Sequence, residues 1–547
     1  MTAEENRHPR GFWFIFWGEL AERASFYGMK TLLLLYMIQK LGYADADSAS
    51  VVSLFTAFCY ILPIVGGYIA DHYLGKFKTI IYFAIPYILG HIILGTFTTE
   101  VGLYTALLLL AGGSGSIKPN ISTLMGLMYQ KAGKSHLMTQ AFSWYYMAIN
   151  IGAAITTFSL PFIRDHYGYG PAFMAPTILM IVSLGIFYIG KKHYPKEEII
   201  HTPGQSITKL YFSFSGRINR VKFWLHIVLV LILAFAMVFL IFFMAARDQG
   251  VIVGYIIAIP AVLWPALALN VKRCHDRGRS GAYALLAFIP FVNIWYIFDI
   301  GFQRGTIGTN DYGPDPVSPE TAERWRTEWP VIIRLSGLFL LIVFFWSIFD
   351  QSYSTWTLFA RDYMILDISL FKWTWHIPPD AVQSLNPVLI VIMTPLFAWL
   401  WSRTDRDETH RLSSPRKMLI GFFLVILCMA LMTVAGYFGV QSKVSIMWEL
   451  GAYILITMAE LCISVVGLQL AFEEAPERMK SMITGIWLCT VFLGDSLAAW
   501  FSRIYTGTTP GNYFGMMTIM IAVVTVLFYY VGRRFERKPE NAGIVKA

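Results

Sequence analysis

Long apolar runs alternate with short polar connections along most of the chain. A helix that crosses a hydrocarbon core of about 30 Å needs about 20 mostly apolar residues, and many runs reach that length. Six runs precede residue 200, near 12–38, 50–70, 79–97, 101–128, 137–160 and 171–190. Six more follow, near 331–360, 380–402, 417–439, 446–472, 480–503 and 512–532. The pattern predicts an all-α polytopic membrane protein with two bundles of six helices.

An apolar insert at about 205–320 lies between the two series. Because the sixth run ends and the seventh begins on the same side, the insert needs an even number of crossings. Runs 223–246 and 250–271 predict a helical hairpin, whereas run 281–303 is broken at Pro290 and predicts a bent or re-entrant piece. We expect three domains: a first bundle at 1–200, an inserted membrane domain at 205–320 and a second bundle at 325–547.

The composition agrees with this interpretation. Hydrophobic residues make up 56% of the chain, charged residues make up 14%, and the mean hydropathy is +0.55, which excludes an ordinary soluble domain. The first run follows a polar start and has no small-residue cleavage site after it, so we expect a retained helix. The five cysteines are scattered and odd in number, and they predict no disulfide framework.

Basic residues in the connections predict the orientation, because cytoplasmic connections carry an excess of Lys and Arg. They fall on alternate connections, on the same side as Arg7 and Arg10: Lys76, Lys78, Lys131, Lys134, Lys191, Lys192, the stretch Arg403–Lys417, Arg478, Lys480, Arg533, Arg534 and Arg537. We expect a multi-pass protein of the bacterial inner membrane with both termini in the cytoplasm. A membrane-facing basic side explains the net charge of +9 without a nucleic-acid partner.

The first apolar run carries an unusual polar stripe. At about 100° per residue, Glu19, Glu22, Arg23 and Lys30 fall in one sector of the helix, with Tyr27 at its edge. A charge at mid-bilayer costs several kcal/mol, so such residues face a bundle interior or a wet cavity. The stripe indicates either a functional site or a buried ion-pair network that only holds helices together. We favour the site, because protonating one of two carboxylates beside an arginine changes the pairing of the other.

Other runs also contain polar residues at membrane depth: Lys118, Asn150, Asp350, Asn386 and Glu460. Lys118 lies in a Gly- and Ser-rich stretch that allows close helix approach. An arginine in the first helix and a carboxylate in a late helix would fit a ligand that has both a carboxylate and an ammonium group. Two alternatives stay open: the asparagines could simply bridge helices, and Trp346 and Trp487 could be core packing.

Several motifs recur in a fixed order: Glu19–Arg23 as ExxER followed by Tyr27, GYIADHYLGKFK at 67–78, Lys118–Asn120 as KPN, Tyr145–Gly152, Ser384–Pro387 as SLNP, and Glu460–Ser464. Together these motifs resemble the proton-dependent oligopeptide transporter (POT/PTR) family of the major facilitator superfamily. The resemblance covers the chain outside the insert. It implies the major facilitator fold and proton-driven import of dipeptides and tripeptides by alternating access between two six-helix halves, with protons as the coupling ion and no other cofactor.

The resemblance also implies residue roles. Glu19, Glu22, Arg23 and Lys118 would couple protons, and Lys30 with Asp350 would form a gate. The peptide would be bound by Arg23, Tyr27, Tyr60, Lys118, Asn150, Trp346, Asn386, Glu460, Ser464 and Trp487. Within this set, Arg23 and Lys118 would hold the peptide carboxylate, and Glu460 would receive its amino terminus. No catalytic or metal residues are implied, the partners are di- and tripeptides and the lipid bilayer, and the protein is expected to be a monomer.

The chain departs from the family at several positions. Asp350 stands where a glutamate is usual, and Lys30 stands where an arginine is common, which weakens or repositions the gate contact because Lys cannot form a bidentate pair. Ala24, Phe26 and Val465 also differ from the usual residues. These three differences bear on the shape of the peptide pocket and leave the proton machinery intact.

The insert carries a second resemblance. FSFSGRINRVKFW at 212–224, RCHDRGRSG at 273–281 and GTIGTNDYGPDP at 305–316 resemble the hallmarks of a small bacterial membrane domain of unknown function. His275 beside Asp276 could indicate a metal or catalytic site, but no further ligands lie at workable spacing. We favour a cytoplasmic turn whose basic residues contact lipid headgroups.

Rival functions remain at this level. A transporter of the same fold could carry other organic anions or drugs, and a membrane receptor or scaffold could bind peptide without moving it. Enzyme activity is the least favoured, because the sequence contains no nucleophile with a base at credible spacing and no phosphate loop.

Overall fold

The computed structural model describes residues 7–196, 207–220, 222–224, 226–227, 230, 251–317, 319–370, 373–404, 412–474 and 480–536. It divides into two compact units. The larger unit combines residues 1–199 with 331–547, and the smaller one spans residues 200–330. Each unit is described by itself below.

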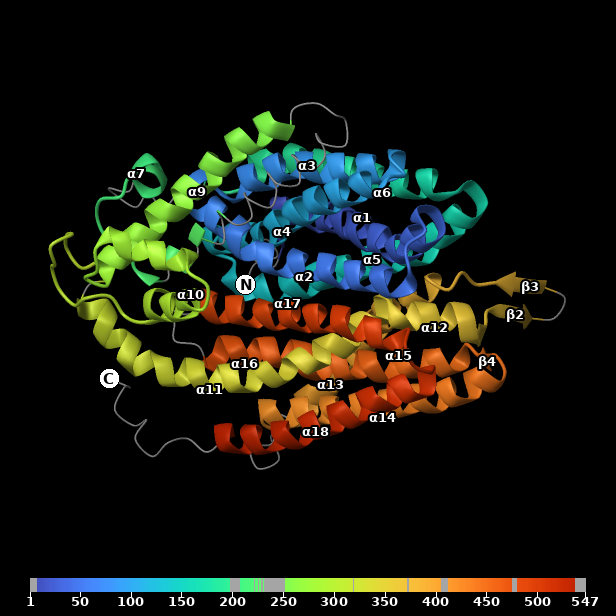
Figure 1. The fold of residues 1–547 in the computed structure, drawn as a ribbon. Coiled ribbons are helices and arrows are strands. Elements are labelled where there is room, and N and C mark those ends of the chain that lie inside the picture. The colour runs from blue at the N-terminus through green and yellow to red at the C-terminus, as the bar shows by residue number, and fades with distance from the viewer. Residues whose placement is uncertain are drawn as a thin grey trace. The chain divides into compact units, whose positions relative to one another are not determined.

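Six long helices form the first part of the larger unit (Figure 1). They are α1 Arg10–Leu41, α2 Asp45–Ile69, α3 Lys76–Thr96, α4 Glu100–Lys131, α5 Met138–Tyr167 and α6 Tyr169–Gly190. Glycines end or separate them where the backbone turns left-handed, as at Gly42 (φ 71°) after α1 and Gly75 (φ 81°) before α3. A π-helical turn at Ala70–Leu74 follows α2. These helices correspond to the first six predicted runs.

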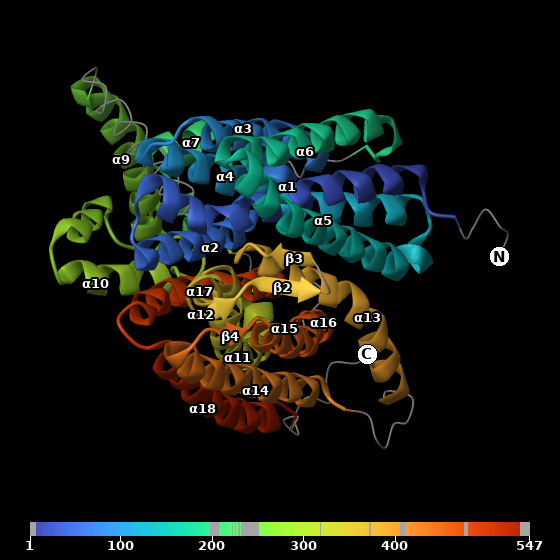
Figure 2. The same cartoon turned by 90° about the vertical axis from the view of Figure 1, so that its right-hand side faces the viewer.

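The second part of the larger unit is also helical, but its helices are more broken. They are α11 Pro319–Phe349, α12 Thr355–Tyr363, α13 Leu385–Thr404, α14 Ser414–Gln441, α15 Met447–Glu460, α16 Val466–Glu474, α17 Lys480–Tyr505 and α18 Pro510–Glu536. Two predicted helices are interrupted: a 3₁₀ turn at Asp350–Tyr353 divides run 331–360, and a π-helical turn at Leu461–Val465 divides run 446–472. In Figure 2 the helices α1–α6 form one group and α13–α18 another.

Two short β-ribbons were not predicted. β1 Met364–Ile365 pairs in parallel with β4 Val444–Ser445. β2 Asp367–Leu370 pairs antiparallel with β3 Trp373–His376, and Figure 1 shows this hairpin extending beyond the ends of the helices. Both ribbons lie in connections whose apolar content is too short to register as a spanning run.

The described part of the chain contains 10 helical segments that are long and apolar enough to cross a membrane. The charged helix α1 is not among them, because Glu19, Glu22, Arg23 and Lys30 lower its hydropathy. The predicted multi-pass membrane architecture is therefore confirmed, and α1 can be accommodated only with its polar side turned into the protein.

The smaller unit holds the described part of the insert. It contains α7 Ile207–Phe212, α9 Val251–Asp276, a 3₁₀ helix at Gly281–Phe288, α10 Val292–Ile297 and a π-helical turn at Phe298–Phe302. The chain bends at Pro290 and Phe291, where Phe291 has a φ of 65°. Residues 231–250 lie outside the described residues, so the first predicted limb of the hairpin, 223–246, is described only in part.

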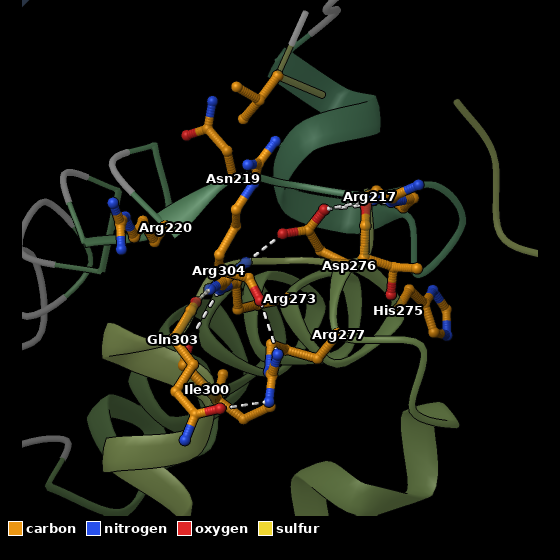
Figure 3. A network of polar contacts seen from close by, with 12 residues as sticks. Arg217, Asn219, Arg220, Arg273, His275, Asp276, Arg277, Ile300, Gln303 and Arg304 are labelled. Atoms are coloured by element: carbon orange, nitrogen blue, oxygen red, sulfur yellow. Dashed lines mark hydrogen bonds and ion pairs between the residues drawn. The ribbon is translucent and has the colours of Figure 1, made fainter. Parts of the chain in front are cut away.

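Ion pairs hold the smaller unit together (Figure 3). Asp276 at the end of α9 pairs with Arg273 and with Arg217, whose guanidinium also donates to the carbonyl oxygens of Thr306 and Gly308. Arg277 pairs with Asp299 at 2.7 Å. Arg217 and Arg273 are buried, so they bind protein groups. Within the turn at 273–281, the expectation that the basic residues contact lipid headgroups is wrong for Arg273.

Close helix approach in the first bundle depends on glycine. A Cβ atom added at Gly66 of α2 would lie 2.3 Å from the Cα atom of Ser116 on α4. Asn120 of α4 reinforces the contact by donating to the carbonyl oxygen of Gly66 at 3.3 Å. The two backbones therefore touch, and no side chain fits between them.

We predict that Gly66→Ala lowers the free energy of unfolding by about 1–3 kcal/mol, because the added methyl group overpacks a backbone contact. Thermal unfolding of the purified protein in detergent measures the change. Gly67→Ala is the matched control, since no atom lies within 4 Å of its added Cβ. Equal effects of the two substitutions would contradict the packing argument.

Candidate functional site

A cavity of about 320 Å³ lies in the larger unit between its two groups of helices. Side chains from α1, α2, α4 and α5 face it on one side, and side chains from α11, α13, α15 and α17 face it on the other. Of the site residues expected from the sequence, all except Glu22 line it: Glu19, Arg23, Tyr27, Lys30, Tyr60, Lys118, Asn150, Trp346, Asp350, Asn386, Glu460, Ser464 and Trp487. The polar stripe of α1 thus meets polar residues from the second half.

Two buried carboxylates share one guanidinium at the α1 side of the cavity. Arg23 Nε lies 2.7 Å from Glu19 Oε1 and 2.7 Å from Glu22 Oε2. Both glutamates are fully buried, and Arg23 is almost so. Because one positive charge cannot neutralise two ionised carboxylates in a low-dielectric interior, a proton on either glutamate stabilises the group.

Lys118 of α4 lies against aromatic rings. Its Nζ atom is 3.6 Å from the ring centroid of Phe26 and 5.4 Å from that of Tyr60. Within the described residues no carboxylate approaches it to ion-pair distance. Aromatic faces stabilise a cation without consuming its hydrogen-bond donors. Lys118 is therefore a cation at the cavity wall that can still donate to an anionic ligand group.

A carboxylate occupies the opposite wall. Glu460, at the end of α15, accepts a hydrogen bond of 2.9 Å from the Nδ2 atom of Asn386 on α13. Asn386 Nδ2 also donates to Thr457 Oγ1 at 3.1 Å, so this asparagine both bridges two helices and faces the cavity. Asn150 differs, because its Nδ2 donates to the carbonyl oxygen of Tyr146 in its own helix. No cation among the described residues pairs with Glu460.

The two tryptophans serve as packing and as cavity wall at once. Trp487 is buried, lies against Gly467, and meets Phe339 edge-on at a centroid distance of 5.2 Å. Trp346 is similarly buried and packs edge-on against Phe349. Both still line the cavity. The two interpretations of these residues made from the sequence are compatible.

Ion pairs join the two halves between the cavity and the end of the larger unit where α1 ends and α2 begins. Lys30 Nζ lies 3.0 Å from Asp350 Oδ1, and both groups are buried. Arg361 of α12 holds Asp45 of α2 through two nitrogens, at 2.6 and 3.2 Å. We call this region the closed end.

A third cross-half pair lies at the closed end, and like the Arg361–Asp45 pair it was not predicted from the sequence. Arg164 of α5 pairs with the buried Asp380, which precedes α13. An arginine beside the apolar run of α5 was the available signal, but its partner is 216 residues away and no local pattern indicates it.

The sequence analysis also missed residues of the cavity itself. Asp495 of α17 is buried and lines the cavity, and Tyr353 stacks under the Lys30 ammonium at 3.8 Å. Phe26 had been noted only as a difference from the residue usual in the family, but its ring lies beneath the Lys118 ammonium. An acidic residue within an apolar run was the signal for Asp495, as it had been for Asp350.

The sequence model of the POT family matches residues 77–243 and 322–520. The chain belongs to the POT family. Its residues 211–314 match a second model, a protein of unknown function called DUF805. Both resemblances drawn from the motifs are confirmed. Members of the POT family are secondary transporters, so this protein is a transporter and not an enzyme.

Similar proteins extend over almost the whole chain. A di-/tripeptide transporter of Lactococcus lactis subsp. cremoris is 26% identical over 540 residues, which cover 96% of this chain and 95% of that protein. Dipeptide and tripeptide permease A of Chromobacterium violaceum is 26% identical over 552 residues, which cover 95% of this chain and 93% of the permease.

Solved structures of POT family transporters share the fold. The crystal structure of one in complex with 5-aminolevulinic acid has a TM-score of 0.73 at 22% identity, and the match covers 96% of this chain and 97% of the other. The structure of PepTSo has a TM-score of 0.68 at 24% identity, covering 97% of this chain and 99% of the other. The predicted major facilitator fold is confirmed.

We predict that Asp380→Asn lowers the free energy of unfolding by about 3 kcal/mol, because it leaves the buried Arg164 charge without its buried partner. Thermal unfolding in detergent measures the loss. The matched control is Asp165→Asn, which removes the half-exposed second partner of the same arginine and should cost about 1 kcal/mol or less. The reverse ranking would contradict the assignment of the Arg164–Asp380 pair as the principal contact.

Proposed function

We propose that the protein is a proton-coupled symporter that imports dipeptides and tripeptides across the bacterial inner membrane. One observation carries the proposal: a single cavity presents Lys118 on one half and Glu460 on the other, and among the described residues neither has an opposite charge of its own. A zwitterion supplies both missing charges, its carboxylate at Lys118 and its ammonium at Glu460. The names of the Lactococcus lactis and Chromobacterium violaceum relatives agree with such a ligand.

The walls of the cavity fit recognition of a peptide by its ends and backbone. Arg23 and Lys118 would hold the carboxylate, and Asn386, Asn150 and Ser464 would hydrogen-bond the backbone. Tyr27, Tyr60, Trp346 and Trp487 would contact side chains through aromatic faces, which tolerate many shapes. The cavity volume of about 320 Å³ lies at the small end of ligand sites and favours short peptides.

Proton coupling follows from the shared guanidinium of Arg23. When Glu22 is ionised, it competes with Glu19 for Arg23. When Glu22 is protonated, Arg23 can turn toward the peptide carboxylate. Proton binding and peptide binding thereby favour each other, which is the thermodynamic requirement for symport.

Alternating access requires that the closed end opens in another state. The pairs Lys30–Asp350, Arg164–Asp380 and Arg361–Asp45 would break together as the two halves rock about the cavity. With both termini in the cytoplasm, as the basic connections predict, the closed end faces away from the cytoplasm. The cavity lies within one chain, which is consistent with a monomer.

The decisive experiment is uptake of labelled dialanine into proteoliposomes that contain the purified full-length protein. We predict accumulation with an inward proton gradient and its loss with a proton ionophore. Glu22→Gln should abolish gradient-driven accumulation while peptide exchange persists, because the side chain at position 22 is then permanently neutral and can no longer take up or release a proton. Glu100→Gln, outside the cavity lining, is the control and should transport normally. Peptide binding without any uptake would instead favour a receptor. The absence of both binding and uptake would indicate that the protein carries another substrate.

We predict that Glu460→Gln weakens the binding of dialanine at least about tenfold. A hydrogen bond to a charged group contributes about 1.5–3 kcal/mol, and each 1.4 kcal/mol is a factor of ten in affinity. Competition against labelled dialanine measures the apparent affinities. A desamino analogue of the dipeptide is the matched control ligand, and its affinity should change little because it has no ammonium group to pair with Glu460. Equal losses for both ligands would show that Glu460 is structural.

A further inference from the structure

The last apolar stretch of the smaller unit turns back on itself over a short distance. The 3₁₀ helix Gly281–Phe288 leads to the reversal at Pro290 and Phe291, and α10 leads back. We call residues 281–302 the short hairpin. At about 2.0 Å per residue, the 8 residues of its 3₁₀ helix reach about 16 Å. A hydrocarbon core is about 30 Å thick, so this limb is long enough for one leaflet and too short for two.

The two ends of the short hairpin are held side by side. Arg277, which precedes it, pairs with Asp299 near its end at 2.7 Å. The same guanidinium donates to the side-chain oxygen of Gln303 at 2.7 Å and to the carbonyl oxygen of Arg304 at 2.6 Å (Figure 3). Because entry and exit are joined by these contacts, the segment returns to the level at which it started.

Contacts with α9 show in which direction the short hairpin extends. Asp299 lies beside Arg277, just past the end of α9, whereas Tyr296 donates to Asn270 within α9 at 2.8 Å. Moving from Asp299 toward the reversal therefore moves back along α9. This helix has 26 residues, about 39 Å, and no charged residue at 251–271, so it is long and apolar enough to span the membrane. The reversal points into the depth that α9 crosses.

The outer surface of the short hairpin is apolar. No charged residue stands between Ser280 and Asp299. Large hydrophobic side chains are exposed along both limbs, and Phe291 at the reversal is 86% exposed. The exposed side chains include Leu285, Phe288, Phe291, Trp295, Phe298 and Phe302. A continuous apolar surface of this kind is unfavourable in water and marks a contact with lipid or protein.

The backbone at the reversal is suited to lipid, where polar groups must be satisfied within the protein. The N–H of Ile289 donates to the carbonyl oxygen of Leu286 at 3.2 Å, and the N–H of Asn293 donates to that of Ile289 at 3.0 Å. The N–H of Val292 donates to the carbonyl oxygen of Pro290 at 2.8 Å. Pro290 itself has no N–H. The reversal thus makes its hydrogen bonds without water.

The base of the short hairpin is cationic. Arg277 and Arg279 share the carboxylate of Asp299, at 2.7 and 3.8 Å, so one acid faces two guanidinium groups there. The Arg279 side chain is half-exposed and lies over the ring of Tyr283 at 5.1 Å. Arg304 follows the hairpin directly. Anionic phospholipid headgroups complement such a base, and their acyl chains complement the apolar limbs above it.

We propose that the short hairpin is embedded in the cytoplasmic leaflet of the bilayer, with Phe291 near the bilayer centre and Arg279 and Arg304 at the headgroups. Acyl chains cover the exposed apolar surface, which requires neither shape complementarity nor hydrogen bonds. The short hairpin adds no crossing to the insert, which fits the even number of crossings that the two bundles require. This placement goes beyond the transport function and does not depend on it.

Site-directed spin labelling tests the depth in the full-length protein, reconstituted in vesicles of phosphatidylethanolamine and phosphatidylglycerol. A nitroxide on Phe291→Cys should collide more with oxygen, which concentrates in lipid, than with a water-soluble nickel chelate. Its depth should approach about 15 Å, half of the hydrocarbon core. Ser280→Cys is the matched control, because Ser280 is exposed at the base and its label should meet the nickel chelate. Wild type gives the labelling background, since four of its five cysteines are buried.

Two results of the depth measurement would overturn the proposal. Equal access of the nickel chelate to the labels at positions 291 and 280 would place the reversal in water. Weak collisions of the Phe291→Cys label with both reagents would show that protein covers the reversal, either the larger unit or a second copy of the chain.

A second measurement tests the return of the chain to one side. A membrane-impermeant maleimide should label Ser280→Cys and Thr309→Cys in inside-out vesicles and neither variant in intact cells. Both residues are exposed, one on each side of the short hairpin. Labelling of the two from opposite sides would show a full crossing, and labelling of both from outside would refute the cytoplasmic leaflet. None of these readouts involves transport, so failure of the proposed function would leave their outcome unchanged.

Discussion

The cost of an uncompensated charge in a water-poor interior is the constraint on which the rest of this structure depends. Helix α1 carries four charged residues at membrane depth, and this is tolerable only because the other helices enclose them. Glu19 and Glu22 compete for Arg23, Lys30 reaches across to Asp350, and Lys118 rests on aromatic rings. The two halves are held in register by the need to complete these pairs, so the same groups that stabilise the fold can respond to a ligand or a proton.

Glycine supplies the geometry that this constraint requires. Gly66 lets α2 touch α4, and Gly494 lets α17 touch α11, so that charged side chains from different helices come within reach of one another. Gly152 does the same between α5 and α1, since its added Cβ would lie 2.4 Å from the Leu20 carbonyl oxygen. Small residues thus determine how tightly the helices can enclose the charges.

Much of the fold could be predicted from the sequence, because membrane helices are defined by the length and hydropathy of a local segment. Most of the cavity could be predicted as well, since the polar stripe of α1 and the isolated acids and amides have no place facing lipid. The turn at Asp350–Tyr353 and the hairpin at Asp367–His376 were missed, because both depend on local hydrogen bonds that hydropathy does not report. The Arg164–Asp380 pair was missed because it is created only by tertiary packing. Asp495 could have been found by the rule that identified Asp350.

The π-helical turn at Leu461–Val465 bears on how the second half can move. It directly follows Glu460 and contains Ser464, so the widened turn lies at the cavity wall. A π turn accommodates one more residue than an α-helical turn, and one residue corresponds to about 100° of rotation about the helix axis. Converting this turn to regular α-helix would rotate α16 relative to α15 without breaking the rod. The π-helical turn therefore allows α16 to rotate about the helix axis at the point where the ligand would contact it.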